Sequence, residues 1–308
     1  MSELIRSSSP HIHSGASTRR IMLDVILALL PAVIASVVIF GLRALSLLVT
    51  CALSAVLAEF VFNLCTRRKQ SVGDLSAVVT GLLLGLNLST NVPLWQGALG
   101  SVFAIVLVKC AFGGLGLNFA NPAIAGRVFL LLAFSSVAGG ANPTIVELTS
   151  SATPLEMLGS ADASLPSLLD MFLGLHGGAV GETCALALLL GYVYLVCRRV
   201  IQWYVPAIFV GTVFVCSLIY SGDAVYALYQ VLGGGLLIGA IFMATDYVSS
   251  PITHSGKMVF ALGCGVLTFV IRAFCSYPEG VSISILAMNI LTPWIEKLTA
   301  NEPIGGAR

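Results

Sequence analysis

Carboxylic acids placed within apolar stretches are the first residues of this chain whose chemistry can be named. Asp24, Glu59 and Asp246 stand among hydrophobic neighbours, and Glu59 lies deepest within its stretch. A carboxylate in hydrocarbon costs about 2.5–3.5 kcal/mol, so it should face a partner, a cavity or an ion path. Glu59 is therefore a candidate for handling Na⁺ or protons. The alternative is an ion pair with Lys109 or Arg127 on a neighbouring helix.

A hydroxyl-rich turn is the second feature, and it lies in the long polar stretch 139–181. Its sequence is Glu147-Leu-Thr-Ser-Ser-Ala-Thr153-Pro154. Pro154 discourages a helix that would bury the Thr153 hydroxyl. The residues just before that threonine are small: Ser150, Ser151 and Ala152. The alternative is an ordinary turn, because a Ser-x-Ala-Thr string arises by chance with a probability of roughly a few tenths in a chain this rich in Ser, Ala and Thr.

The elements that position these residues must be membrane helices. Hydrophobic residues make up 57% of the chain and charged residues 9%, with a mean hydropathy of +0.99, which excludes a soluble domain of 308 residues. Apolar runs of about 17–25 residues predict ten spans. We expect 74–90 and 281–298 to be short or interrupted, and partly re-entrant. The spans are 21–40, 44–64, 74–90, 94–112, 122–138, 180–197, 203–220, 226–245, 257–275 and 281–298.

The distribution of basic residues predicts the orientation. With ten spans, only Arg43 and Arg272 fall on one side. Because basic residues concentrate in the cytoplasm, both termini are expected there and the 139–181 loop outside. That loop contains no Lys or Arg. The basic residues of the other side are Arg6, Arg19, Arg20, Arg67, Arg68, Lys69, Arg198, Arg199, Lys257 and Arg308, with Lys109, Arg127 and Lys297 at span ends.

Span parity predicts an inverted repeat, because five spans on each side of the loop force the second half to run upside down. The expected fold is an all-α polytopic membrane protein of about ten transmembrane helices in two inverted five-helix repeats. Its parts are a cytoplasmic arm (1–20), the first repeat (21–138), the extracytoplasmic loop (139–180), the second repeat (181–298) and a cytoplasmic tail (299–308).

Glycine, proline and asparagine mark expected helix breaks at 113–122 and 277–289. Non-helical backbone at membrane depth survives only where protein buries it or a polar cavity adjoins it. Asn121 can therefore line a site or simply cap a helix, whereas Asn289 favours the structural role. Asp24 and Asp246 lie close enough to the cytoplasmic interface to be hydrated. The eight scattered cysteines and four histidines indicate no metal site.

Several segments resemble the D subunit of the Rnf complex, and more distantly the B subunit of the sodium-pumping NADH:quinone oxidoreductase. Residues 147–153 also resemble the acid-x-x-Ser/Thr-x-Ala-Thr motif of bacterial respiratory subunits, with Glu147 in place of the usual Asp and Ser151 in place of a frequent Gly. The other segments are Asn121-Pro-Ala, Gly181-Glu-Thr-Cys-Ala-Leu-Ala-Leu-Leu-Leu-Gly191, Thr245-Asp-Tyr-Val-Ser-Ser-Pro-Ile-Thr253 with Gly256-Lys257, and Tyr277-Pro-Glu-Gly280 with Met288-Asn289.

The resemblance implies a subunit of a plasma-membrane complex that moves electrons between ferredoxin and NAD while driving Na⁺ or H⁺ across the bilayer. It implies that Thr153 carries FMN through a phosphodiester bond made by a separate flavin transferase. A second, noncovalent flavin such as riboflavin is implied near the cytoplasmic side. Implied partners are the other Rnf subunits, among them a second covalent-flavin subunit and the soluble subunits that react with NAD and ferredoxin. Nucleic acid is not an expected partner.

A secondary transporter or channel is the alternative from another class, because inverted repeats, broken helices and a buried acid are typical of it. Such a protein does not need the threonine motif. A purely structural scaffold leaves both the motif and the buried acid without a role. Covalently bound flavin would distinguish the redox function from both alternatives.

Overall fold

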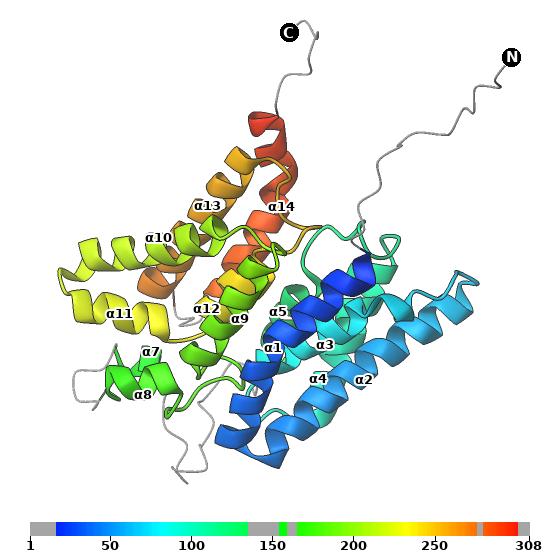
Figure 1. Cartoon of the computed structure of the whole chain (residues 1–308), viewed down its shortest axis with the longest axis horizontal. Helices are drawn as coiled ribbons and strands as arrows, with labels where there is room; N and C mark the ends of the chain where they lie inside the picture. Colours follow the sequence, from blue (N-terminus) through cyan, green and yellow to red (C-terminus); the bar gives the residue numbers. More distant parts are fainter. Residues whose placement is uncertain (1–16, 135–153, 159–164, 276–279, 301–308) are drawn as a thin grey trace, which may run out of the picture.

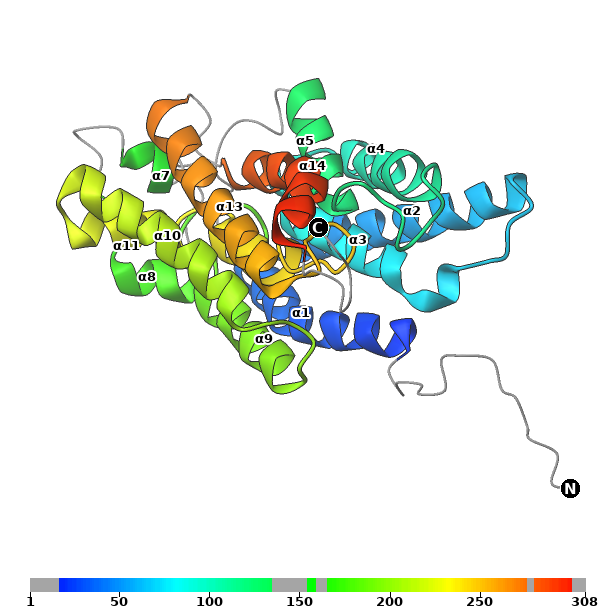
Figure 2. The ribbon, with the colours of Figure 1, turned by 90° about the horizontal axis from the view of Figure 1, so that it is seen from above.

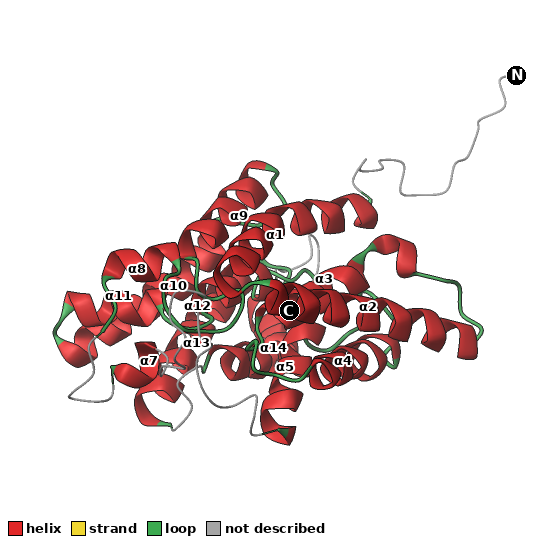
Figure 3. Ribbon diagram, turned by 90° about the horizontal axis from the view of Figure 1, so that it is seen from below, coloured by secondary structure: helices red, strands yellow, loops and turns green. Residues whose placement is uncertain are grey.

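Helices form nearly all of the secondary structure of the described chain. The computed structural model describes residues 17–134, 154–158, 165–275 and 280–300, and these ranges contain no β-strand (Figure 3). The motif residues Glu147, Ser150, Ser151, Ala152 and Thr153 lie outside the described residues, as do most of the N-terminal arm and of the C-terminal tail.

The first half of the chain contains five helical segments separated by short turns. They are α1 (Thr18–Phe40), α2 (Leu42–Cys65), α3 (Ser76–Leu86) after a 3₁₀ turn η1 (Val72–Asp74), α4 (Leu94–Phe103) continuing as the π-helix η2 (Ala104–Cys110), and α5 (Pro122–Ala133). Two short helices follow in the polar loop, α7 (Pro154–Met157) and α8 (Leu168–Leu173).

The second half has a similar series of segments. They are α9 (Ala185–Cys197), α10 (Tyr204–Ser221), α11 (Ala224–Leu232), α12 (Leu236–Ile238) with the π-helix η3 (Gly239–Met243), α13 (His254–Phe274) and α14 (Val281–Thr299).

Local sequence explains where the helices begin and end. Asn121 caps the start of α5 and is followed by Pro122, whose fixed φ and missing N–H suit the first turn. Asp223 and Thr253 cap α11 and α13 with their side chains. Between α10 and α11 the chain turns at Gly222, whose φ of 69° favours glycine.

The helices have the length and composition of membrane spans. In the described residues, five helices are long and apolar enough to cross a membrane, and the bent pair α11 with α12–η3 forms a sixth candidate. Four shorter apolar helices accompany them: α3, α4–η2, α5 and α9. Large apolar side chains such as Ile34, Val38 and Leu57 are exposed. Their exposure would be unfavourable in water but is not unfavourable in lipid. The predicted all-α polytopic membrane class is confirmed.

The two halves lie side by side (Figure 1), with the first half in blue to teal and the second in green to red. Helix α1 packs against α9, and α5 packs against α14 (Figure 2). Within the halves, α2 packs on α4 and α10 packs on α13. The same partners recur in each half, which is the pattern an inverted repeat would produce; the repeat itself stays a prediction.

Two predictions about helix interruptions have opposite outcomes. Helix α3 is only 11 residues long, as expected of a short segment. The expected interruption of 281–298 is wrong, because α14 runs unbroken from Val281 to Thr299. The break lies instead within the predicted span 226–245, where α11 and the α12–η3 segment meet at an angle of 64°.

Candidate functional site

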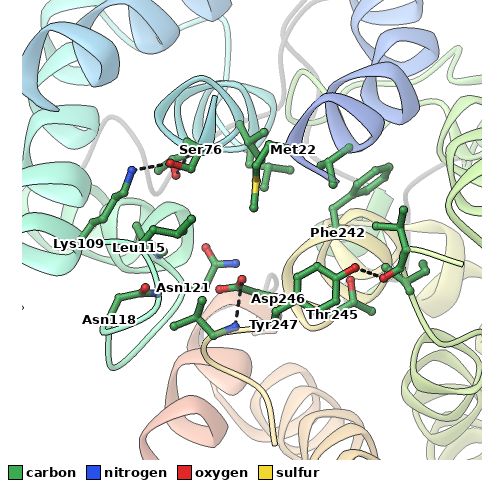
Figure 4. Close-up of a pocket in the computed structure, with 18 of the residues that line it drawn as sticks. Met22, Ser76, Lys109, Leu115, Asn118, Asn121, Phe242, Thr245, Asp246 and Tyr247 are labelled. Atoms are coloured by element: carbon green, nitrogen blue, oxygen red, sulfur yellow. Dashed lines mark hydrogen bonds between the residues drawn. The ribbon is translucent and has the colours of Figure 1, made fainter. Parts of the chain in front are cut away.

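A cavity between the two halves adjoins several of the predicted polar residues and is the candidate for a ligand site. Helices α1, α3 and η2 line it from the first half, and α9, η3 and the segment after η3 line it from the second (Figure 4). Polar lining residues are Ser76, Thr80, Lys109, Asn118, Asn121, Thr245 and Asp246.

Asn121 joins the two halves at the wall of this cavity. Its Oδ1 accepts hydrogen bonds from the amides of Ala123 (3.0 Å) and Ile124 (3.4 Å), and its Nδ2 donates to the Met243 carbonyl (3.3 Å). With its amide oriented to satisfy both neighbours, Asn289 accepts from the Asn121 amide at 3.1 Å and donates to the Ser249 carbonyl at 3.1 Å. Asn121 therefore caps α5, and it also lies in the wall of the cavity.

Asn118 has spare hydrogen-bonding capacity in the same wall. It is 6% exposed, and its Nδ2 donates to the Ala120 carbonyl at 2.9 Å. Within the described part of the chain, its Oδ1 has no hydrogen-bond partner. A buried acceptor without a donor is costly, so a donor from a bound molecule would satisfy it.

Glu59 forms the ion pair that was its alternative interpretation. Lys109 Nζ lies 2.9 Å from Oε1 and 3.0 Å from Oε2 of Glu59, and 2.6 Å from Oγ of Ser76. Glu59 is 0% and Lys109 1% exposed. Ser71 donates a further hydrogen bond to Glu59. Lys109 lies in the π-helix η2, a type of helix often found at functional sites, and both Lys109 and Ser76 reach the cavity.

Asp24 differs from the expectation of simple hydration. It is 6% exposed and pairs with Arg198, whose Nη2 lies 3.2 Å from Oδ1, while the Tyr194 hydroxyl donates to the same oxygen at 3.0 Å. The correction has a structural cause: α1 and α9 pack together, so residues of α9 cover the carboxylate.

Asp246 projects into the cavity from the segment that follows η3 (Figure 4). The Ser249 hydroxyl donates to its Oδ2 at 2.9 Å. Burial raises the pKa of the Asp246 carboxyl above its ordinary value, and the hydrogen bond from Ser249 opposes that rise.

A second buried charge cluster was not singled out from the sequence. Arg127 Nη1 lies 3.0 Å from Oε1 of Glu182 and also donates to Oδ1 of Asn87. Arg127 and Glu182 are each 4% exposed. The signal was available, because Glu182 is an acid inside the predicted span 180–197, as Glu59 is in its own span.

The segment that follows the threonine motif is anchored at the broken span. Leu155, in α7, is buried. Its side chain lies against the glycines that separate α11 from α12, since a Cβ built on Gly234 would be 2.7 Å from Leu155 Cδ1. Arg272 donates to the carbonyls of Gln230 and of Gly233 (3.2 Å for the latter), which stabilises the break.

Membrane-spanning helices, a broken span and buried ion pairs around a polar cavity define a polytopic membrane protein with an internal polar site. Its sequence matches the family described as NQR2, RnfD, RnfE over residues 5–305. The chain belongs to this family, which confirms the resemblance noted above.

Three relatives, each the D subunit of its complex, show the extent of the similarity. The chain is 46% identical over 303 residues to that of the Na(+)-translocating ferredoxin:NAD(+) oxidoreductase complex of Acetobacterium woodii, covering 97% of this chain and 94% of the relative. It is 38% identical over 323 residues to that of the proton-translocating ferredoxin:NAD(+) oxidoreductase complex of Clostridium ljungdahlii, covering 98% and 96%. It is 33% identical over 340 residues to that of the ion-translocating oxidoreductase complex of Escherichia coli O7:K1, covering 95% and 96%.

Proposed function

We propose that this chain is the membrane subunit of an ion-translocating ferredoxin:NAD oxidoreductase complex, that Thr153 carries FMN covalently, and that the complex couples electron transfer to Na⁺ or H⁺ movement. The observation that carries the proposal is the similarity over nearly the whole chain to subunits of that name, one from a Na⁺- and one from a proton-translocating complex. The reactions of NAD and ferredoxin take place on other subunits, so this chain has no complete active site of its own.

The proposed location is the bacterial plasma membrane, with both termini in the cytoplasm and the 139–180 loop outside. The asymmetry of basic residues supports this orientation. A secreted flavin transferase could then reach Thr153.

The covalent site is proposed on residues 147–153, which precede α7 directly. Bound FMN supplies one-electron transfer. The protein's contribution at this end is positional: Leu155 fixes the chain two residues after Thr153 against Gly233 and Gly234. The segment that follows the proposed attachment site is thereby held against the break between α11 and α12.

The cavity between the halves is the proposed site of the noncovalent flavin. Its lining combines apolar side chains with a few polar groups, as is typical of small-molecule sites. The Oδ1 acceptor of Asn118 matches the imide N–H that such a ring presents. Asn121, Thr245 and Asp246 provide further polar contacts in the same cavity.

Ion coupling is proposed to involve Glu59, with Asp24, Asp246 and Asn121 as further candidates for the ion path. The support is that Glu59 is fully buried and connected through Lys109 to the cavity. Coupling requires that the redox state changes the affinity or access of an ion site, since a site with equal energy in both states moves nothing.

Paired substitutions test the two flavin sites against each other. The chain is expressed with its flavin transferase and the other subunits, and the purified complex is divided between a denaturing gel and acid precipitation. Thr153→Ala should lose the fluorescent band and the FMN-sized mass on its peptide, yet still release flavin into the acid supernatant. Asn118→Leu should keep the fluorescent band and lose most of the released flavin, because the apolar side chain offers no acceptor.

Thr149→Ala is the matched control, since it removes a hydroxyl from the same loop and should keep both flavins. Absence of a fluorescent band in the unaltered protein, despite an active transferase, would contradict the covalent assignment and reopen the transporter interpretation. Equal flavin release from unaltered protein and Asn118→Leu would move the noncovalent site away from this cavity.

A further inference from the structure

Three short helical segments begin or end close together between the two halves: α3 ends there, and α9 and α12 begin there. Helix α3 stops at Leu86, and the segment leading into α9 bonds to the turn beyond it, from the Val180 amide to the Leu88 carbonyl (3.0 Å) and from the Gly181 amide to the Leu86 carbonyl (2.7 Å). Segment α12 begins after Gly235. In membrane transporters, substrates and ions bind where discontinuous helices meet.

In this protein a fixed ion pair occupies that place. Arg127 comes from α5, Glu182 from the lead into α9 and Asn87 from the end of α3, and the three are bonded to one another through the guanidinium. The cluster lies against the start of α12, since a Cβ built on Gly235 would be 2.7 Å from Oε1 of Glu182 and 3.4 Å from Nη1 of Arg127. The charged pair therefore contacts all three broken elements.

The cluster lies between the cavity and the segment that follows the threonine motif. On one side, Asn87 Nδ2 donates to the carbonyl of Leu83 at 2.7 Å, and Leu83 lines the cavity. On the other side, Gly235 adjoins the cluster, and Gly233 and Gly234, which precede it directly, contact Leu155. The guanidinium therefore stands in the series of contacts that leads from the cavity wall to Leu155.

We propose that Arg127 is a permanent positive charge that closes the interface between the two halves to Na⁺ and protons, and that Glu182 and Asn87 hold it in place. Arginine suits this role because its guanidinium is not deprotonated in proteins and its planar fork bonds two acceptors at once. Membrane channels exclude cations by the same electrostatic means. Arg127 is thus a specificity-determining residue for what crosses this subunit.

This barrier has a consequence for the direction of ion movement. A coupling ion that entered the cavity beside Asp246 could not continue along the interface while the pair is intact. It would have to return or leave through a neighbouring subunit. The inference rests on the membrane-spanning fold and on the pair itself, and not on either flavin.

Passive leak is the measurement that tests the barrier. The purified complex is reconstituted into liposomes without reductant, and the inward leak of Na⁺ and of protons is followed with enclosed fluorescent dyes. Arg127→Gln leaves the buried carboxylate of Glu182 without its cation, so we expect the leak of cations to rise about tenfold or more over the unaltered complex. Glu182→Gln keeps the guanidinium and should stay within about twofold of the unaltered complex.

The contrast between these variants separates an electrostatic role from a structural one. Arg127→Lys keeps the positive charge but loses the planar guanidinium, so its cation leak should also stay close to that of the unaltered complex. This variant keeps the test usable where Arg127→Gln does not assemble. The set of subunits in the purified complex and the fluorescent band of the denaturing gel report assembly independently of ion flow. Any one of three results would overturn the proposal. They are an equal cation leak in Arg127→Gln and Glu182→Gln, a raised cation leak in Arg127→Lys, and an unchanged cation leak in Arg127→Gln.

Discussion

Lys109 Nζ lies within hydrogen-bond distance of three acceptors, the two carboxylate oxygens of Glu59 and the hydroxyl of Ser76. This fixes the geometry of a pair that is removed from water. Removing one partner of such a pair costs about 3–5 kcal/mol, because the remaining charge is left buried and uncompensated. Any functional experiment on Glu59 therefore needs a control for stability.

Glu59→Gln is expected to reduce the number of ions moved per electron more than it reduces flavin content. The measurement is the ratio of ion uptake to electron transfer in liposomes, with flavin determined on the same preparation. The double variant Glu59→Gln, Lys109→Met removes both charges and provides the stability control. Pumping at the level of the unaltered complex in either variant would remove Glu59 from the ion path.

Residue-level prediction from the sequence was good where both partners lie in the same half of the chain. The apolar surroundings of Glu59 were enough to predict a buried partner, and Lys109 was one of two named candidates. Arg127 was the other, yet it pairs with Glu182, because the meeting of α5 with the lead into α9 depends on the packing of the two halves. Asn118 likewise became a candidate only once the cavity was known.

At the scale of elements, the close contact between α1 and α9 depends on a glycine, Gly191. A Cβ built on Gly191 of α9 would overlap the carbonyl oxygen of Ala28 in α1. Gly211 of α10 is a matched position, because it also lies inside a helix and a Cβ there meets nothing within 4 Å.

Gly191→Ala is therefore expected to lower the apparent melting temperature of the purified protein, in proportion to an overpacking cost of about 1–3 kcal/mol. Gly211→Ala should leave it unchanged or raise it, since alanine is favoured over glycine in a helix by roughly 0.5–1 kcal/mol. A thermal unfolding curve for each variant in detergent gives the comparison. Equal shifts for both would show that the close approach of α1 and α9 is not needed for stability.

The sequence predicted most helices and misplaced one interruption. Glycine, proline and asparagine over 277–289 suggested a break, but α14 runs unbroken from Val281. Asn289 within it bonds to Ser249 and Asn121, so the helix continues without an unsatisfied amide. The pattern Gly235-Leu-Leu-Ile-Gly239 looked like part of a continuous span. It follows a bend whose carbonyls at Gln230 and Gly233 are satisfied by Arg272, a partner that is distant in sequence.

At the scale of the whole molecule, the orientation of the chain across the membrane can be tested by experiment. Three cysteines at helix ends are exposed and can report it: Cys65 and Cys197 at the ends of α2 and α9, and Cys275 at the end of α13. The predicted topology puts the first two on the cytoplasmic side and the third outside.

Variants that retain one of these cysteines should differ in their reaction with a membrane-impermeant maleimide added to spheroplasts. Cys275 should be labelled in intact spheroplasts, whereas Cys65 should be labelled only after lysis. Gel mobility or mass gives the extent of labelling, and lysis serves as the control for access. The reverse pattern would invert the orientation and place the threonine motif in the cytoplasm.

The backbone bonds from Val180 and Gly181 to the turn after α3 also bear on how the protein is made. The ribosome synthesises Leu86 and Leu88 first, and their hydrogen-bond donors follow roughly 95 residues later in the chain. Synthesis of that stretch takes about 5–20 s at ordinary rates of translation. During that interval these two carbonyls of the nascent first half lack their partners, which is costly for any backbone group away from water. Completion of the first half thus depends on insertion of the second, so a ribosome pause between them would leave an intermediate that quality-control proteases can attack.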